Sequence, residues 1–459
     1  MSILQRLRER FWFIPAILCA AAFMLAESLI ATDRWLGDLV VPDWLSVFLY
    51  RVGESGSRDI LGAIASSSLA VAGTTFSITI AVLALTSSSY GPRLVRNFMA
   101  DRGNQAVLGV FVSTFLYSLL VLRSIRVLGD PGDQDAEVFV PHLAVNAAVL
   151  LAVLNVAVLV YFIHHISDSI QVSTLTGTVR SELLRTIDRL YPADIGRGGR
   201  RADDEGDGGA VPREVADALP AEVEAHGAPV TAARCGYVQS IGDDELMGAA
   251  RRHDVLLALR VRPGLYVLDD TVTVLVHPPD RADDRLVAAI RSAVKITDAR
   301  SPHQDPEFAV QQLTEMAVRA LSPGTNDPYT AVNALSDLSV GLARLAARTP
   351  PSTARADDDG TVRVHALGVS MSQLIGSVVD SMRWYAASAP GVMHATLGIL
   401  ELVGDHARTP ELRVELASHV DLLEAAFNDA GHQQYDVAQL TDHAASVRRS
   451  LLAVRAGGA

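Results

Sequence analysis

Hydroxyl-bearing residues recur along one long apolar segment, residues 66–90, which reads SSSLAVAGTTFSITIAVLALTSSSY. If that segment is a helix with about 100° per residue, a set of them falls near one line. This set, which we call the hydroxyl stripe, consists of Ser68, Thr75, Thr79 and Thr86. Hydroxyl oxygens can replace part of the water shell of an ion or solute, so the stripe could line a path through a membrane. Small and hydroxylated residues also permit close packing of helices in lipid, and packing is the more ordinary explanation.

A second group of chemically capable side chains lies later in the chain, where His303, Asp305 and Glu307 alternate. Such groups could bind a ligand or a metal ion, or perform acid–base work. However, alternating residues before a helix diverge unless a loop bends them inward. Asp305 followed by Pro306 is also an ordinary helix start. We favour capping for Asp305 and predict no metal site, no cofactor and no catalytic residue.

The stretch SPGTNDPYTA, residues 322–331, predicts a turn between two helices. Gly324 can end the incoming helix, and Asp327 can cap the next one, with Pro328 at its first position. Asn326 and Asp327 could also approach the cluster at residues 303–307 in the fold. The residues that define this turn are Ser322, Pro323, Gly324, Asn326, Asp327 and Pro328.

The sequence also argues against several functional classes. It contains no nucleophile elbow, no phosphate-binding glycine loop and no zinc-spaced cysteine pair, so we predict that the protein is not an enzyme. Its net charge of -13 argues against a nucleic-acid partner, which would need a basic face. Cys19 and Cys235 are the only cysteines, which makes a disulfide framework improbable.

The elements that must position these residues begin with four long apolar segments near the N-terminus. They run approximately over residues 11–31, 60–85, 106–122 and 143–163, and no segment of similar length follows. Each is near the roughly 20 residues that an α-helix needs to cross a bilayer, and a helix satisfies its own backbone in lipid. We therefore predict a transmembrane domain of four helices within residues 1–165, with the lipid bilayer as its partner.

The orientation in the membrane is indicated only by the first helix. Arginines lie on both sides of the predicted spans, but Arg6, Arg8 and Arg10 precede the first one, and the first helix often dominates. This places both termini in the cytoplasm. Between the first two spans, residues 41–52 could form a short helix on the outer surface or a packed loop.

The rest of the chain predicts an α+β cytoplasmic region, so the protein as a whole is mainly α. An amphipathic stem helix, residues 166–195, continues the fourth span and is followed by a glycine-rich, charged linker, residues 196–228. Short strands then indicate a small β-rich module, residues 229–280, before a helical bundle at residues 281–459. Within that bundle, residues 349–360 read as a loop.

Three stretches together resemble a known family. They are TTFSITIAVLALTSSSYGPRLVRNF, QDPEF and RALSPGTNDPYTA. In these stretches the chain is similar to the bacterial predicted membrane proteins called domain of unknown function 2254, and the similarity extends over nearly its whole length. The resemblance implies a bacterial inner-membrane protein. It implies no activity and no catalytic residues.

Two hypotheses about function follow from the sequence. In the favoured one, the protein is a homo-oligomeric channel or transporter for a small ion or solute, with the hydroxyl stripe along the path and a regulatory cytoplasmic domain. In the other, it is a membrane-anchored sensor or scaffold without transport activity. Four helices with a polar stripe favour the first, because an anchor alone needs one helix.

Overall fold

The computed structural model describes residues 12–36, 53–90, 101–126, 139–169, 171–191, 219–348 and 352–453. The possible surface helix at residues 41–52 and most of the predicted linker, residues 196–218, lie outside these residues. The chain divides into two compact units, Met1–Thr174 and Leu175–Ala459. We call them the N-terminal and C-terminal units and describe each by itself.

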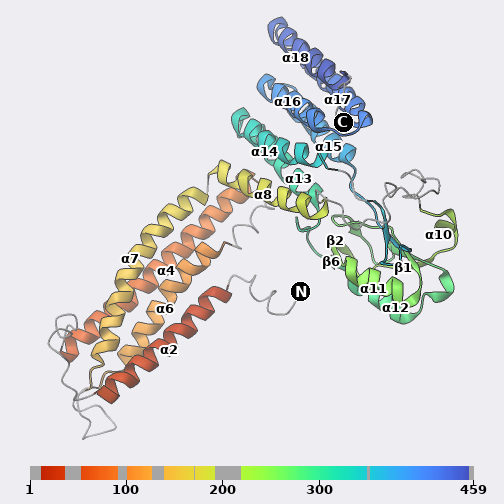
Figure 1. Ribbon diagram of the computed structural model, residues 1–459. Coiled ribbons are helices and arrows are strands. Elements are labelled where there is room, and N and C mark those ends of the chain that lie inside the picture. The colour runs from red at the N-terminus through yellow and green to blue at the C-terminus, as the bar shows by residue number, and fades with distance from the viewer. Residues whose placement is uncertain are drawn as a thin grey trace. The chain divides into compact units, whose positions relative to one another are not determined.

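Four helices in the N-terminal unit are long and apolar enough to cross a membrane. They are α2 (Phe13–Leu36), α4 (Glu54–Tyr90), α6 (Arg102–Ser124) and α7 (His142–Ser169). Helix α6 packs against the other three and is the most buried of them (Figure 1). The four predicted spans are therefore confirmed as helices, although each extends beyond the apolar segment that predicted it.

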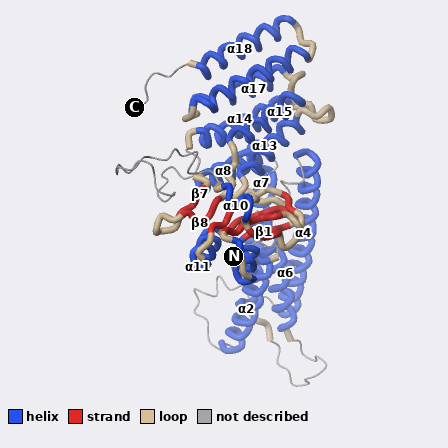
Figure 2. The backbone as a smooth tube through the Cα atoms, turned by 90° about the vertical axis from the view of Figure 1, so that its right-hand side faces the viewer, coloured by secondary structure: helices blue, strands red, loops and turns tan. Residues whose placement is uncertain are grey.

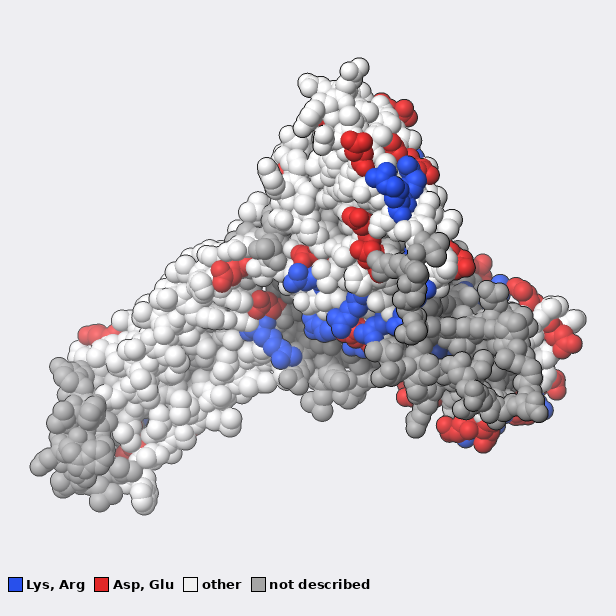
Figure 3. Space-filling view, turned by 45° about the horizontal axis from the view of Figure 1, so that its top comes forward, with Lys and Arg blue, Asp and Glu red and all other residues white. Residues whose placement is uncertain are grey.

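The outer surface of this bundle is apolar. Leu150, Val153, Val156 and Val160 on α7 are all well exposed, Leu150 at 71%. Few charged side chains appear on the face of these helices that Figure 3 shows. Trp12 and Trp35 lie exposed at the two ends of α2, as tryptophans do at membrane surfaces. A water-soluble bundle would bury these groups, so the bundle suits a lipid environment.

The predicted continuation of the fourth span into a stem is wrong in one respect. Helix α7 ends at Ser169, and a separate helix, α8 (Val172–Leu190), follows it. The apolar period runs through both helices, so it does not reveal the break. Gln171, the described residue between the two helices, is not helical.

Two small sheets form the centre of the C-terminal unit, and Figure 2 shows their strands gathered in one region. The larger has the order β1-β5-β3-β8-β7 and the smaller the order β4-β2-β6. Among the described strands, β3 and β8 pair in parallel and the other neighbours are antiparallel. The strands are β1 (Ala228–Thr231), β2 (Gly236–Ile241), β3 (Leu256–Leu259), β4 (Tyr266–Val267), β5 (Val272–His277), β6 (Val294–Thr297), β7 (Ala354–Ala356) and β8 (Val362–His365).

Helices α11 (Asp243–His253) and α12 (Asp284–Ala293) complete this core. Leu246 from α11 and Ile290 from α12 are buried in one cluster with Leu257 and Val274 from the larger sheet. A short helix, α10 (Ala221–His226), precedes β1, and a 3₁₀ turn, η1 (Pro279–Arg281), follows β5. Apolar burial of this extent, at about 25 cal/mol per Å², is the main force that holds such a layer together.

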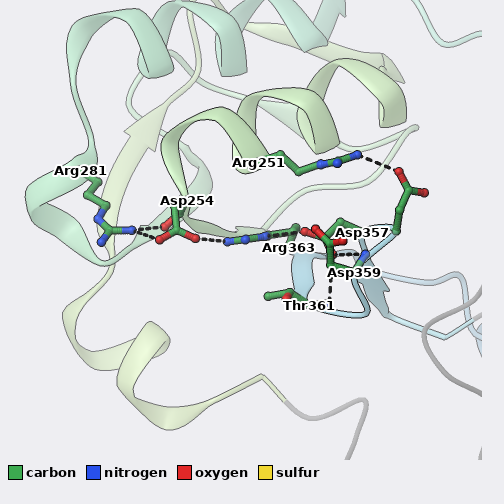
Figure 4. A network of polar contacts seen from close by, with 8 residues as sticks. Arg251, Asp254, Arg281, Asp357, Asp359, Thr361 and Arg363 are labelled. Atoms are coloured by element: carbon green, nitrogen blue, oxygen red, sulfur yellow. Dashed lines mark hydrogen bonds and ion pairs between the residues drawn. The ribbon is translucent and has the colours of Figure 1, made fainter.

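The predicted loop at residues 349–360 is also wrong, because β7 lies within it and pairs with β8. This hairpin is tied to the end of α11 by charged groups (Figure 4). Asp254 forms ion pairs of 2.6 Å with both Arg281 and Arg363, and Arg363 also contacts Asp357 at 2.9 Å. Hydrogen bonds from Arg363 and then Arg281 lower the pKa of Asp254, so its carboxylate stays charged at neutral pH.

Six helices follow or flank the hairpin and stack on one another (Figure 1). Within this stack α14 packs on α13 and α16, α15 packs on α13 and α17, and α18 packs on α16 and α17. The predicted helical bundle thus begins at α13, after β6 and not at residue 281. The helices are α13 (Pro306–Ala320), α14 (Pro328–Ala346), α15 (Met371–Tyr385), α16 (Pro390–His406), α17 (Pro410–Asp429) and α18 (Gln434–Leu452).

Candidate functional site

The hydroxyl stripe of α4 faces the interior of the N-terminal unit. Ser68, Thr75 and Thr79 are all buried, while the side chain of Thr86 lies outside the described residues. The hydroxyls of Thr75 and Thr79 donate to carbonyls of their own helix, at 2.9 Å and 2.8 Å. This bonding leaves each threonine oxygen able to accept a further hydrogen bond.

Asn155 of α7 links three helices at the level of Ser68. Its amide nitrogen donates to the Ser68 hydroxyl at 2.9 Å, and its amide oxygen accepts from the Thr114 hydroxyl of α6 at 3.2 Å. All three side chains are buried. Asn146, which also lies on α7, donates to the His142 carbonyl of its own helix. Interhelical hydrogen bonds of this kind contribute about 0.6 kcal/mol on average in a membrane.

Asn104 of α6 faces the stripe at a different level, beside Thr75 and Thr79. These three side chains share a cavity of about 10 Å³ with Val107, Leu108, Phe76 and Phe162. Polar side chains therefore lie beside the stripe at two heights of the bundle: Asn155 at Ser68, and Asn104 at Thr75 and Thr79. The sequence pattern does not single out Asn104, because it precedes the apolar segment at residues 106–122 and only the structure extends α6 over it.

A larger cavity of about 130 Å³ lies in the C-terminal unit. It opens where β3 and β8 end, and ligands commonly bind at the carboxyl ends of parallel strands. The end of α8, the start of α11 and the segment after β8 complete its wall. The lining residues are Leu190, Tyr191, Ile241, Asp243, Leu259, Val261, Arg262, Pro263, Gln304, Ser352, Thr353, Arg355, Ala366, Leu367, Gly368 and Val369.

Two opposite charges, Asp243 and Arg355, line this cavity. Burial raises the pKa of the Asp243 carboxyl, and the positive charge of Arg355 opposes that rise. Within the described residues neither side chain forms an ion pair, whereas Arg262 is held by Glu307 at 2.7 Å. Much of the remaining wall is aliphatic. The cavity therefore offers one acidic and one basic group beside apolar surface.

Of the predicted cluster, Asp305 and Glu307 share a contact with Arg300, whereas His303 is held elsewhere. Asp305 accepts two hydrogen bonds from Arg300, at 2.8 Å and 3.0 Å, and caps α13 through the Phe308 N–H at 3.0 Å. His303 contacts Arg189 of α8. Burial raises the pKa of Asp305, against the opposing charge of Arg300. No group of metal-binding side chains is found among the described residues.

Gln304, from the same motif, reaches the wall of the larger cavity. Its amide oxygen accepts from the Ile241 N–H at 2.8 Å, and its amide nitrogen donates to the Ile241 carbonyl at 3.2 Å. Within the QDPEF motif, Gln304 therefore bonds to the end of β2, and Asp305 caps the start of α13. The two Gln304 bonds hold Ile241, which also lines the cavity.

The turn at residues 322–328 joins α13 to α14. Asp327 accepts from the N–H of Thr330 at 3.1 Å, with Pro328 at the first helical position. Gly324 does not end α13, which finishes at Ala320, and the left-handed residue of the turn is Asn326, with φ 45°. Ser322 closes the turn by accepting the N–H groups of Thr325 and Asn326 through its carbonyl.

Comparison with known proteins agrees with the membrane architecture. The family described as "Predicted membrane protein (DUF2254)" matches residues 8–401. Uncharacterized protein Mb1321c of Mycobacterium bovis is 29% identical over 432 residues, which cover 93% of this chain and 77% of that protein. Uncharacterized protein Rv1290c of Mycobacterium tuberculosis shows the same identity and coverage. No solved structure matches the chain.

Proposed function

We propose that this chain, which belongs to the DUF2254 family of predicted membrane proteins, is a membrane-anchored sensor whose C-terminal unit binds a small ligand. The proposed role is binding and signalling without catalysis. We further propose that the spanning helices lie in a bacterial inner membrane with both termini in the cytoplasm. The ligand site would then face the cytoplasm.

The cavity at the ends of β3 and β8 is the observation that supports this proposal. Asp243 and Arg355 present opposite charges to it, and residues such as Leu259, Val261 and Leu367 supply apolar wall. A small zwitterion with an apolar body, such as an aliphatic amino acid, complements both features. Pockets that combine apolar lining with a few oriented polar groups are typical ligand sites.

Helix α8 supports the signalling part of the proposal. Its last residue, Leu190, and the adjoining Tyr191 line the cavity. The helix is fastened to the C-terminal unit by an ion pair of 2.6 Å between Arg180 and Asp337 and by the Thr186 hydroxyl on the Pro302 carbonyl. Since α8 follows α7 in the chain, a ligand that shifts its end can act on the last span.

The proposal is tested by thermal unfolding of the full-length protein in detergent, with leucine as the probe and isovalerate and isoamylamine as analogues that lack one charge. A ligand at about 100 times its Kd stabilises the folded state by about 2.7 kcal/mol, which raises Tm by several degrees. We expect leucine to raise Tm more than either analogue.

A matched pair of glycine variants shows whether the cavity is responsible. Gly368 lines the cavity and has free space around its Cβ position, so Gly368→Leu should fill the site and abolish the shift. Gly324 is equally unobstructed but lies outside the cavity, so Gly324→Leu should keep it. No Tm shift with any of the three probes, or a shift that survives Gly368→Leu, would refute the proposed site.

A homo-oligomeric channel or transporter is the second candidate, favoured by the polar groups at two levels of the bundle. Burial of Ser68, Thr75 and Thr79 among helices of one chain supports packing more than pore lining. The channel predicts flux of a small ion or solute through reconstituted liposomes, reduced by Thr79→Leu. For the sensor we expect no flux above that of empty liposomes, and Thr79→Leu should lower only stability.

A further inference from the structure

The side-chain amide of Asn104 is a buried polar group. The residue is 4% exposed, and neither its amide oxygen nor its amide nitrogen forms a hydrogen bond with any part of the chain that the structure describes. A buried amide in this condition is costly, more so in a bundle surrounded by lipid. Native structures rarely contain such a group unless a bound molecule satisfies it.

The cavity that Asn104 lines has the size and chemistry for one small molecule. Its volume of about 10 Å³ corresponds to a single water position. Thr75 and Thr79 border it with oxygens that can still accept, because their hydroxyl protons are directed to carbonyls of α4. A water in this position could accept from the Asn104 nitrogen and donate to two oxygens.

A cation fits the same cavity less well. The other lining residues, Phe76, Val107, Leu108 and Phe162, are all apolar, so no carboxylate lines the cavity to offset a positive charge. A buried ion without a counter-charge carries a large desolvation cost. The amide nitrogen of Asn104 is also a donor, and a cation cannot use it.

We infer that this cavity binds one water molecule, which bridges Asn104 of α6 to Thr75 and Thr79 of α4. The bridge joins two spanning helices, α4 and α6. Asn104 lies in the first turn of α6, close to its cap Asp101, whose side chain is part-buried and contacts His165.

A double-mutant cycle on the full-length protein in detergent tests the bridge. Thr79→Val and Asn104→Leu should each lower Tm, and the combined variant should lower it by clearly less than the sum. The reason is that either substitution alone already removes the shared water, so the two sites are coupled without touching. Thr74→Val is the matched control, because Thr74 lies on the exposed face of α4, and its effect should add to that of Asn104→Leu.

Two further measurements decide the identity of the bound species. An experimental map that resolves ordered waters should show a peak within hydrogen-bonding distance of both the Asn104 nitrogen and the Thr79 oxygen. Additive Tm effects together with an empty map at this position would overturn the inference. Stability that rises with sodium chloride but not with choline chloride, and is lost in Asn104→Leu, would assign a cation and overturn it as well.

Discussion

Gly264 lies where a side chain would collide with a buried ion pair. Its φ is 94°, and an added Cβ would lie 2.4 Å from an Asp305 oxygen and 2.9 Å from an Arg300 nitrogen. Asp305 is 1% exposed and depends on Arg300 for its charge balance. Separating such a buried pair costs about 3–5 kcal/mol, because an uncompensated charge remains.

We predict that Gly264→Ala destabilises the C-terminal unit by at least about 3 kcal/mol, from backbone strain and displacement of the ion pair together. Gly360→Ala is the matched control, because Gly360 also has a positive φ, 81°, but nothing lies within 4 Å of its Cβ position. Gly360→Ala should lower the free energy of unfolding by only about 1–2 kcal/mol. The stability of both variants is measured by thermal unfolding and by hydrogen exchange of the amides in β2 and β6. Equal losses would mean that the collision with Asp305 does not matter.

Single residues differ in how far the sequence predicts their surroundings. The caps Asp305 and Asp327 follow from local order, because each precedes a proline and a helical pattern. The partners Arg300 and Arg262 do not follow, since nothing in the spacing selects them from the other arginines. Asn104 is harder still, because its importance depends on which face of α6 meets α4.

At the scale of elements, two histidines join helices α16 and α18. The Nδ1 atoms of His394 and His443 lie 2.9 Å apart, and their rings stack with centroids 5.1 Å apart. Burial lowers the pKa of His394, the charge of His443 lowers it further, and Asp436 opposes them. At a separation this short, one ring nitrogen must be unprotonated to accept from the other.

We predict that this contact makes the helical stack less stable in mild acid. The folded-state pKa of His394 lies below its unfolded value of 6.5, so the unfolded chain binds the proton more readily. The stability that the neutral His394 contributes to the folded state is fully present above pH 6.5. It is lost progressively as the pH falls below 6.5 toward the lower pKa of the folded state. His394→Phe should flatten the dependence of Tm on pH between 7.5 and 5.0. His406→Gln, at an exposed histidine of α16, should leave it unchanged, and an equal slope in all three proteins would contradict the prediction.

Elements were predictable where their pattern is local. Helices α13 to α18 follow from apolar spacing and caps, and the fold class is confirmed as mainly helical, with spans first and a mixed region after. The hairpin of β7 and β8 was missed because ARADDDGTVRVH looks like a polar loop. Its strand β8 is stabilised by pairing with β3, which lies far away in the sequence. The candidate ligand cavity was missed for the same reason, since its wall comes from several distant segments.

At the scale of the whole molecule, the exposed apolar surface distinguishes the two units. On α7 that surface is a nearly continuous band, and on α2 it is bounded by Trp12 and Trp35. Replacing a lipid-facing residue by arginine near the middle of a span costs about 2.5–3.5 kcal/mol of insertion free energy. The apolar surface of the bundle therefore suits the hydrocarbon core of a bilayer.

The proposed orientation makes a prediction about thiol accessibility. With four spans, residue 53 at the start of α4 and Cys235 in the C-terminal unit lie on opposite sides of the membrane. In a Cys19→Ala background, an impermeant maleimide should label Cys235 only after the cells are permeabilised. Gly53→Cys in a Cys19→Ala, Cys235→Ala background should be labelled in intact spheroplasts, since nothing lies within 4 Å of the Gly53 Cβ position. The reverse pattern would put the candidate ligand cavity outside the cell, and labelling of both thiols in intact cells would mean that the number of crossings is odd.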